Sequence, residues 1–289
     1  MKQAENAGFG VFNTSNLSCP VLVSVPHAGR DYPQAVFDNL RLPPDMLLRL
    51  EDRYADLLAR TCIQDGTALI IAHRARAWID LNRAETDIDA DMVDGADRDS
   101  LPAPGAKQRG GLGLIPRRLS GAGDIWRRRI AMADVTQRIE HFHRPYHTQI
   151  AGILARIREK FGVAILLDLH SMPPLHLQVA GPSPQIVIGD LFGRSANARY
   201  SEALMARAKH HGFAAALNHP YSGDFMLRRH CDPSRNIHAV QLEIDRTLYL
   251  DDILREPSGG LAQMTEFVAE MVQMLTEEAL GGQTLMAAE

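Results

Sequence analysis

Short apolar runs alternate along this chain with longer stretches in which apolar residues recur at helical spacing. The runs are typical of buried strands and lie at residues 21–25, 68–72, 163–169, 185–189 and 237–243. The helix-like stretches lie near residues 44–64, 124–158, 195–211 and 260–279. Because strands that alternate with helices favour a parallel arrangement, we predict an α/β fold with a mostly parallel sheet flanked by helices.

Three of the predicted strands end in residues suited to metal or acid–base chemistry. His27 follows the first strand, His170 follows the third, and Glu243 ends the last. The carboxyl ends of neighbouring strands in an α/β sheet open onto a common crevice, so residues far apart in the sequence can converge there. The pattern therefore predicts a chemical site at that edge.

The chain is long and apolar enough for a substantial core, with 289 residues of which 45% are hydrophobic. We predict a single domain over residues 1–289. Residues 84–123 lose periodicity and are rich in Asp, Pro and Gly, which predicts a long loop. Its part from Arg109 to Arg118 could close over a ligand or form a disordered surface loop. The alanine-containing tail at residues 286–289 is predicted to fray.

The net charge of -4 favours neither a nucleic-acid nor a membrane partner. The basic run at residues 127–129 has few aromatic neighbours, so we interpret it as a solvated helix face. Cys19, Cys62 and Cys231 are odd in number and form no CxxC pair, which argues against a disulfide framework. No apolar segment has the length of a membrane span, and residues 1–10 lack the pattern of a signal peptide. We expect a cytoplasmic protein.

His27 and His170 are the first candidate metal ligands. Asp168 and His170 point to the same side of their strand, because side chains alternate along a strand. Metal-bound histidines commonly donate their second ring nitrogen to a carboxylate, so Asp168 is a candidate to orient His170. The alternative is an ordinary buried acid paired with an arginine.

A catalytic zinc ion usually takes three protein ligands, so two histidines need a third partner. The candidates are Glu51, Asp52 and Asp56, which lie in a helix-like stretch with Asp52 and Asp56 one turn apart. The alternative for these acids is pairing with Arg49, Arg53 or Arg60 on a solvated face.

Glu243 shares one face of its strand with Gln241. A buried acid is costly without a partner or a purpose, so Glu243 is a candidate general base beside an activated water. The alternative is a salt bridge to Arg246. The three histidines at residues 141, 143 and 147 flank Pro145, which we expect to break the spacing of a metal pair. We interpret that segment as a kinked helix with mainly structural histidines.

Six short motifs occur in an order that is hard to obtain by chance. They are Val-Pro-His-Ala-Gly at His27, Asp-Arg-Tyr-Ala-Asp from Asp52, Asp-Leu-Asn-Arg from Asp80, Pro-Tyr-His from Pro145, Asp-Leu-His-Ser from Asp168, and Gln-Leu-Glu ending at Glu243. This series, from about His27 to about Tyr249, resembles the N-formylglutamate amidohydrolase family. The resemblance implies a zinc hydrolase with a phosphorylase/hydrolase-like, three-layer α/β/α sandwich around a mixed sheet, as in zinc carboxypeptidases.

The resemblance also implies roles for individual residues. The zinc ligands would be His27, Asp52 and His170, and the general base would be Glu243. Asn82 and Arg83 resemble the pair that grips the substrate carboxylate and polarises the scissile carbonyl in zinc carboxypeptidases. Arg228 or Arg229 stands where the family has an arginine suited to bidentate carboxylate binding.

The chain departs from the family pattern at several positions. Gly223-Asp224 replaces a pair of glycines, and Arg117 stands where a small hydroxyl residue is expected. Gly29 and Arg30 occupy the place where zinc carboxypeptidases carry their acidic ligand, so the acidic ligand would come from Asp52 instead.

The sequence therefore predicts zinc-dependent hydrolysis of an N-acyl amino acid. The favoured reaction converts N-formyl-L-glutamate to formate and L-glutamate, as in histidine breakdown. One alternative is a deacylase or carboxypeptidase-like enzyme for another acidic N-acyl substrate. A second is a non-catalytic binding protein on the same fold, against which the apparently intact ligand set and Glu243 argue.

Overall fold

A seven-stranded mixed sheet is the core of the fold, with the strand order β1-β3-β2-β8-β11-β9-β10. The computed structural model describes residues 8–175 and 182–286. The strands are β1 (Phe9–Phe12), β2 (Val21–Val25), β3 (Ala68–Ala72), β8 (Ala164–Met172), β9 (Ile186–Gly189), β10 (Ala215–Leu217) and β11 (Ile237–Asp245). Strand β2 is parallel to β3 and β8, and β8 is parallel to β11. Strand β9 is antiparallel to β11 and parallel to β10.

The central strands form where the sequence has continuous apolar runs. Every residue of β2, β3 and β8 is buried, as expected for parallel strands covered on both faces. All five predicted strands are present, and the mixed, mostly parallel sheet confirms the predicted fold class. The two edge strands β1 and β10 were not predicted; they are short, and most of their residues are only partly buried.

Contacts within the chain define two compact units. The loop unit comprises Met1–Gly10, Pro26–Asp52 and Ala72–Gln149, and the sheet unit comprises Val11–Val25, Arg53–Ile71 and Ile150–Glu289. Neither unit is a continuous segment. The prediction of a single domain over the whole chain stays a prediction, and the predicted frayed tail at residues 287–289 lies outside the described residues.

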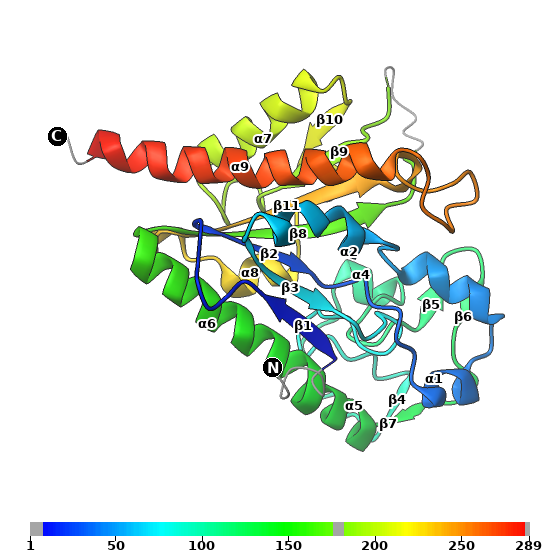
Figure 1. Cartoon of the computed structure of the whole chain (residues 1–289). Helices are drawn as coiled ribbons and strands as arrows, with labels where there is room; N and C mark the ends of the chain where they lie inside the picture. The colour runs from blue at the N-terminus through cyan, green and yellow to red at the C-terminus, as the bar shows by residue number, and fades with distance from the viewer. Residues whose placement is uncertain (1–7, 176–181, 287–289) are drawn as a thin grey trace. The chain divides into compact units, whose positions relative to one another are not determined.

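Helices cover both faces of the sheet within the sheet unit. Helix α9 (Leu261–Met286) contacts α2 (Ala55–Leu58), α3 (Arg60–Gln64) and α7 (Ala198–His210). Helix α8 (Phe225–His230) contacts β8 and β11 and, in Figure 1, lies on the opposite face from α9, together with the C-terminal half of α6 (Arg144–Phe161). This is the predicted α/β/α layering. Among the described residues, no helix combines the length and apolarity that crossing a membrane requires.

The loop unit contains short elements joined by long turns. Its helices are α1 (Gln34–Asn39), the 3₁₀ helix η2 (Pro44–Leu50), α4 (Ala106–Arg109), α5 (Met132–Arg138), the π-helix η3 (Ile139–His143) and the start of α6. Two small ladders pair β4 (Val93–Asp94) with β7 (Ile130–Ala131), and β5 (Arg118–Leu119) with β6 (Gly123–Asp124). The remaining 3₁₀ helices, in the sheet unit, are η4 (Pro233–Arg235) and η5 (Arg246–Leu248). The stretch at residues 84–123 holds only short elements, and the long loop predicted there stays a prediction.

Two predicted helices differ from the structure. The stretch at residues 44–64 is broken into η2, α2 and α3. Glu51 is extended after η2, and Tyr54 adopts a left-handed conformation with φ of 59° before α2. Asp52 therefore lies outside any helix, and the prediction that Asp52 and Asp56 share one helical face is wrong. The second helix begins at Met132 rather than near residue 124. The exposed arginines at residues 127–129 are consequently solvated, as predicted, but are not on a helix.

The segment around Pro145 belongs to one helical stretch. The π-helix η3 ends at His143 and α6 follows directly at Arg144, so Pro145 lies just after the π-helical turn of a helix that continues from α5. The His143 and His147 rings are 4.4 Å apart between centroids. The prediction that Pro145 disrupts the regular i, i+4 geometry of a metal pair at these histidines stays a prediction.

His238 on β11 is a buried histidine that should make stability depend on pH. Burial and the positive charge of Arg199 lower the pKa of His238 from 6.5 to about 4. The unfolded chain therefore binds more protons between those values, so stability is full above pH 6.5 and is lost as the pH falls toward 4. We expect His238→Gln to lose about 2 kcal/mol less than the wild type between pH 7 and pH 4.5. Urea unfolding at the two pH values measures this difference, and equal losses would contradict it.

Candidate metal centre

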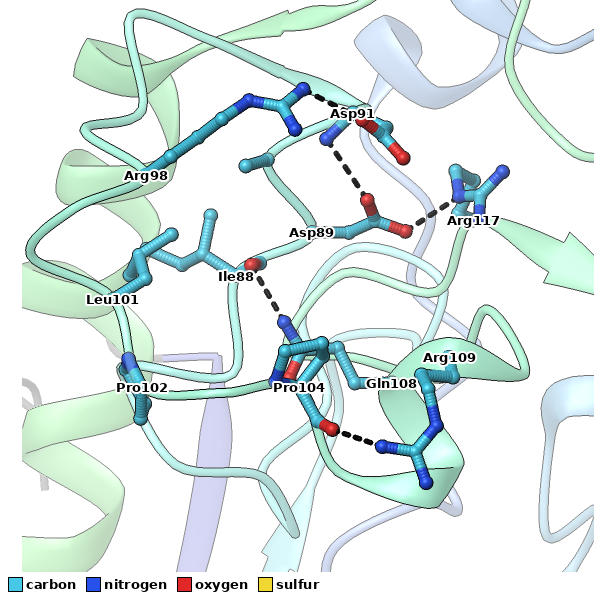
Figure 2. Close-up of a pocket in the computed structure, with 11 residues that line it drawn as sticks. Ile88, Asp89, Asp91, Arg98, Leu101, Pro102, Pro104, Gln108, Arg109 and Arg117 are labelled. Atoms are coloured by element: carbon cyan, nitrogen blue, oxygen red, sulfur yellow. Dashed lines mark hydrogen bonds and ion pairs between the residues drawn. The ribbon is translucent and has the colours of Figure 1, made fainter.

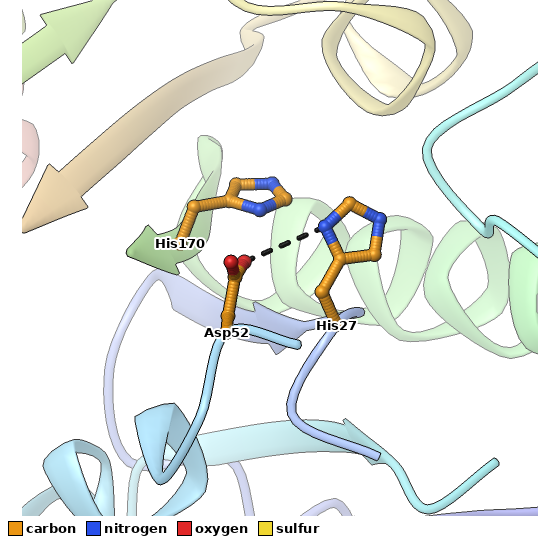
Figure 3. Close-up of side chains that lie close together, drawn as sticks. All are labelled: His27, Asp52 and His170. Carbon is orange, nitrogen blue, oxygen red and sulfur yellow. Dashed lines mark ion pairs between the residues drawn. The ribbon is translucent and has the colours of Figure 1, made fainter. Parts of the chain in front are cut away.

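Three buried side chains form one group of potential metal ligands. His27, Asp52 and His170 each offer one ligand atom, and these atoms all lie within 4.8 Å of one another (Figure 3). The Nδ1 atom of His27 is 3.4 Å from Oδ2 of Asp52. The group contains the two strand-end histidines and, of the three acids considered from the sequence, Asp52 but neither Glu51 nor Asp56.

The backbone of the loop unit brings His27 and Asp52 together. His27 follows β2 by two residues, and its carbonyl accepts a hydrogen bond from the amide of Asp52 at 2.9 Å. Gly29 lies against the backbone of Arg74, and a Cβ atom at position 29 would collide with the Arg74 carbonyl group. The small residues after His27 thus allow the backbone to pass close to Arg74. This turn places the His27 imidazole beyond the end of β2.

The sheet unit holds His170 through the predicted carboxylate. Nε2 of His170 donates a hydrogen bond to Oδ2 of Asp168 at 2.7 Å, and the Ser24 hydroxyl donates to Oδ1 of Asp168 at 3.1 Å. Asp168 and His170 both belong to β8 and are buried. The partners of Asp168 are therefore a histidine and a serine, not the arginine of the alternative interpretation.

The loop unit holds His27 in the same manner, through a carboxylate that sequence reasoning missed. Nε2 of His27 donates to Oδ1 of Asp80 at 2.7 Å. Asp80 also accepts from Nε of Arg76 at 2.8 Å and from the amide of Asn82 at 2.8 Å. Burial alone would raise the pKa of Asp80, but the charges of Arg76, His27 and Arg83 outweigh burial and hold that pKa well below its usual range. The signal in the sequence was the first residue of the Asp-Leu-Asn-Arg motif.

The donor set fits a divalent metal such as zinc. Because Nε2 of each histidine donates to a carboxylate, Nδ1 is the ring atom that would bind a metal. Two imidazole nitrogens and one carboxylate are a ligand set found in catalytic zinc sites, where the fourth position is left to water or substrate. The burial of all three side chains also favours a bound cation over an uncompensated carboxylate.

Glu243 is aligned with His170 in the sheet. The two residues are register partners in the parallel β8–β11 ladder, and Glu243 is only 8% exposed. Oε1 of Glu243 accepts a hydrogen bond from Nε2 of Gln241 at 2.9 Å. Arg246, the partner in the alternative interpretation, donates from Nε to the Ser171 hydroxyl at 3.0 Å. Glu243 thus lies level with His170, each two residues before the carboxyl end of its strand, which continues to Asp245 in β11 and to Met172 in β8.

Asn82 and Arg83 are buried in the loop unit next to Asp80. The Arg83 guanidinium donates from Nε to the Leu112 carbonyl at 2.8 Å and from Nη1 to the Asn82 carbonyl at 2.5 Å. Its Nη2 atom is 4.0 Å from Oδ2 of Asp80. These contacts anchor Arg83 in the loop, and its predicted role in substrate binding stays a prediction.

Arg228 and Arg229 lie on α8 of the sheet unit and are both exposed. Nη2 of Arg228 donates to Oδ1 of Asp224 at 2.5 Å, which links the helix to the residue that departs from the family's glycine pair. This pairing occupies one nitrogen of the Arg228 fork. The predicted role of Arg228 or Arg229 in substrate binding stays a prediction.

A separate pocket of about 350 Å³ lies within the long loop of the loop unit. Figure 2 shows its two ion pairs, Arg117 with Asp89 at 2.6 Å and Arg98 with Asp91 at 2.7 Å. Arg109 donates to the Pro104 carbonyl at 2.5 Å. The loop therefore carries internal ion pairs and a hollow, instead of being a featureless surface segment.

The known proteins and the family model that match this chain do so over most of its length. The family model for N-formylglutamate amidohydrolase matches residues 19–250. An N-formylglutamate deformylase from Pseudomonas putida is 32% identical over 268 residues, which are 88% of this chain and 90% of that protein. One from Pseudomonas aeruginosa is 28% identical over 273 residues, or 90% of this chain and 92% of that protein.

Solved structures show the same fold. The crystal structure of an N-formylglutamate amidohydrolase from Ralstonia eutropha superimposes with a TM-score of 0.87 at 28% identity, covering 96% of this chain and 99% of that one. A gene product of Agrobacterium tumefaciens, 21% identical, superimposes with a TM-score of 0.69 over 97% of this chain and 96% of that one, which concerns the fold alone.

Proposed function

The chain belongs to the N-formylglutamate amidohydrolase family, and on that premise we propose that it is a zinc-dependent hydrolase that converts N-formyl-L-glutamate to formate and L-glutamate. The observation that carries the proposal is the buried His27, Asp52 and His170 group, in a chain similar to proteins named N-formylglutamate deformylase. The substrate is a small molecule. Histidine breakdown and a cytoplasmic location stay predictions from the sequence.

The proposed metal site uses His27, Asp52 and His170 as ligands. Zinc bound there would act as a Lewis acid toward the formyl carbonyl and lower the pKa of water toward neutrality. Asp80 and Asp168 would hold the two imidazole rings in the orientation and tautomer that binding needs. The loss of such an orienting carboxylate typically weakens metal binding 10- to 100-fold.

Glu243 would carry the proton through the reaction. Its carboxylate would take one proton from water as the water oxygen attacks the formyl carbon. It would then deliver that proton to the glutamate nitrogen as the C–N bond breaks, so that formate and a free amine leave. The position of Glu243 opposite His170 in the β8–β11 ladder supports this assignment.

Arg83, with Asn82, would bind a carboxylate or the carbonyl oxygen of the substrate. A guanidinium is suited to this task because its planar fork donates two parallel hydrogen bonds to a carboxylate. Arg228 or Arg229 would supply a second cation for a substrate that carries two carboxylates. Accumulating negative charge on the carbonyl oxygen would be stabilised by such donors held in place before the reaction.

Arg83→Lys tests this assignment because the substitution keeps the charge and removes the fork. We expect a folded, metal-loaded protein whose kcat/KM for N-formylglutamate falls about 10- to 100-fold, the range for loss of a hydrogen bond to a charged group. Steady-state kinetics and thermal melting measure the two effects. Arg144→Lys is the matched control, since Arg144 pairs with Glu85 on the exposed side of the same unit.

An Arg83→Lys protein that melts early but turns over normally when folded would make Arg83 part of the scaffold. Its bonds to the Leu112 and Asn82 carbonyls are the structural basis for that alternative. Carboxylate recognition would then be sought at Arg228, Arg229 or the loop from Arg109 to Arg118.

A hydrolysis screen on the zinc-loaded protein tests the proposed function itself. The substrates would be N-formylglutamate, N-acetylglutamate, N-formylaspartate, N-formylglutamine and a glutamyl dipeptide, with release of the amine measured. We expect the highest kcat/KM for N-formylglutamate. A higher value for another acidic N-acyl substrate would make the protein a different deacylase, and no hydrolysis of any would favour a binding protein.

A further inference from the structure

Two buried histidines of the loop unit contact the backbone of one short segment. His143, the last residue of η3, donates from Nε2 to the Arg83 carbonyl at 2.7 Å. His147, in the first turns of α6, donates from Nε2 to the Leu81 carbonyl at 3.0 Å. The two carbonyls flank Asn82, so the histidine pair holds this segment at two adjacent points.

The held segment carries the groups that the proposed reaction needs in the loop unit. Asp80 orients His27 through Nε2 and also accepts the amide of Asn82. The side chain of Arg83 extends from the same segment. A displacement of the Leu81 and Arg83 carbonyls would therefore move the carboxylate that orients His27 and the guanidinium together.

The helix geometry explains why two histidines act as a pair. They are four residues apart, with ring centroids 4.4 Å from each other, and both are buried at 1% and 4% exposure. The π-helix η3, which ends at His143, determines where the two rings lie along the helix. Such π-helical turns are rare and occur frequently at functional sites. Because the two imidazole rings pack against each other, each ring restricts the motion of the other.

Other roles for the pair are not favoured by its contacts. Among residues 8–175 and 182–286, the group of potential metal ligands is formed by His27, Asp52 and His170 and does not include His143 or His147. The Nε2 atom of each is already directed at a backbone carbonyl. His141, the third histidine of the motif, is exposed, and its Nδ1 is 2.8 Å from the Gln137 carbonyl oxygen one turn earlier.

We propose that His143 and His147 are positioning residues that fix the Asp80–Arg83 segment, and through Asp80 the orientation of His27 toward the metal. This inference rests on the proposed function only for the identity of the metal and of the substrate. The contacts that carry it lie wholly within the loop unit.

The test is the double variant His143→Leu/His147→Leu compared with His143→Gln/His147→Gln. Leucine removes the donors, whereas the glutamine amide places a donor near the position of Nε2. Zinc affinity is measured by chelator competition, and amide hydrogen exchange of residues 80–84 is measured on the metal-free full chain. His141→Leu is the matched control from the same π-helix.

We expect the leucine variant to bind zinc about tenfold more weakly, at the low end of the effect of residues that orient ligands. Exchange at residues 80–84 should rise about tenfold, while exchange in β8 stays as in the wild type, because local opening differs from global unfolding. The glutamine variant should recover most of both losses, and His141→Leu should change neither. Normal zinc affinity with unchanged local exchange in the leucine variant would overturn the proposal.

The outcome is separable from that of the proposed function. If the zinc-loaded wild type fails to hydrolyse N-formylglutamate, zinc affinity and local exchange still decide the role of the pair. If the wild type binds no zinc, the exchange of residues 80–84 decides it alone. Should the double leucine variant not fold, His147→Leu is compared with His147→Gln by the same criteria.

Discussion

Glu243→Gln is expected to leave the protein folded and zinc-loaded while lowering kcat on N-formylglutamate about 100- to 10,000-fold, the usual cost of losing a general base. Glutamine keeps the size of the side chain but has no basic oxygen to accept a proton from water. The neighbour Gln241 can still hydrogen-bond to an amide, so local packing should survive. Formate release and zinc content per chain measure the two effects.

Asp245→Asn is the matched control for that variant. Asp245 is a buried acid on the same strand, and its carboxylate accepts hydrogen bonds from the Thr247 amide and hydroxyl, both at 2.8 Å. Loss of the Asp245 carboxylate should lower the free energy of unfolding and have little effect on kcat. A Glu243→Gln protein with bound zinc and near-normal turnover would require a different general base.

Replacement of His27 or His170 by alanine is expected to remove metal and activity together. The wild type should carry about one zinc ion per chain, because two imidazoles and one carboxylate leave a fourth position of the catalytic kind. Each variant leaves only two of these ligands, so zinc content should fall well below one per chain and hydrolysis should fall to background. Elemental analysis after dialysis measures the metal directly.

His211→Ala is the control, because it removes a histidine that is hydrogen-bonded to a carboxylate outside the proposed metal site. Nε2 of His211 donates to Oε2 of Glu270 at 2.7 Å, and neither residue belongs to the ligand group. This variant should keep its zinc and its activity. Full zinc occupancy in the double variant His27→Ala/His170→Ala would remove the basis of the assignment.

The sheet was predictable because its strands are long, continuous apolar runs. Strands β2, β3 and β8 are buried on both faces, so the sequence pattern and the tertiary requirement coincide. The same reasoning placed His170 and Glu243 at adjacent strand ends, and alternation along β8 placed Asp168 beside His170. In each case the local geometry of a strand was sufficient for the prediction.

The parts that depend on contacts distant in the sequence were not predictable from pattern. The left-handed Tyr54 breaks a stretch with helical periodicity, and Asp52 is placed by a hydrogen bond from its amide to the carbonyl of His27. The bond between His27 and Asp80 joins residues that are 53 positions apart. Periodicity carries no information on such pairings, so Asp80 was noticed only as part of a motif.

Titration of zinc into the metal-free full chain tests the central claim most directly. The account predicts that the apoprotein does not hydrolyse N-formylglutamate and that formate release rises linearly with added zinc until about one equivalent per chain, then stays constant. The His170→Ala protein should show no such rise. Hydrolysis at the full rate by the metal-free chain, or no recovery on adding zinc, would contradict the account.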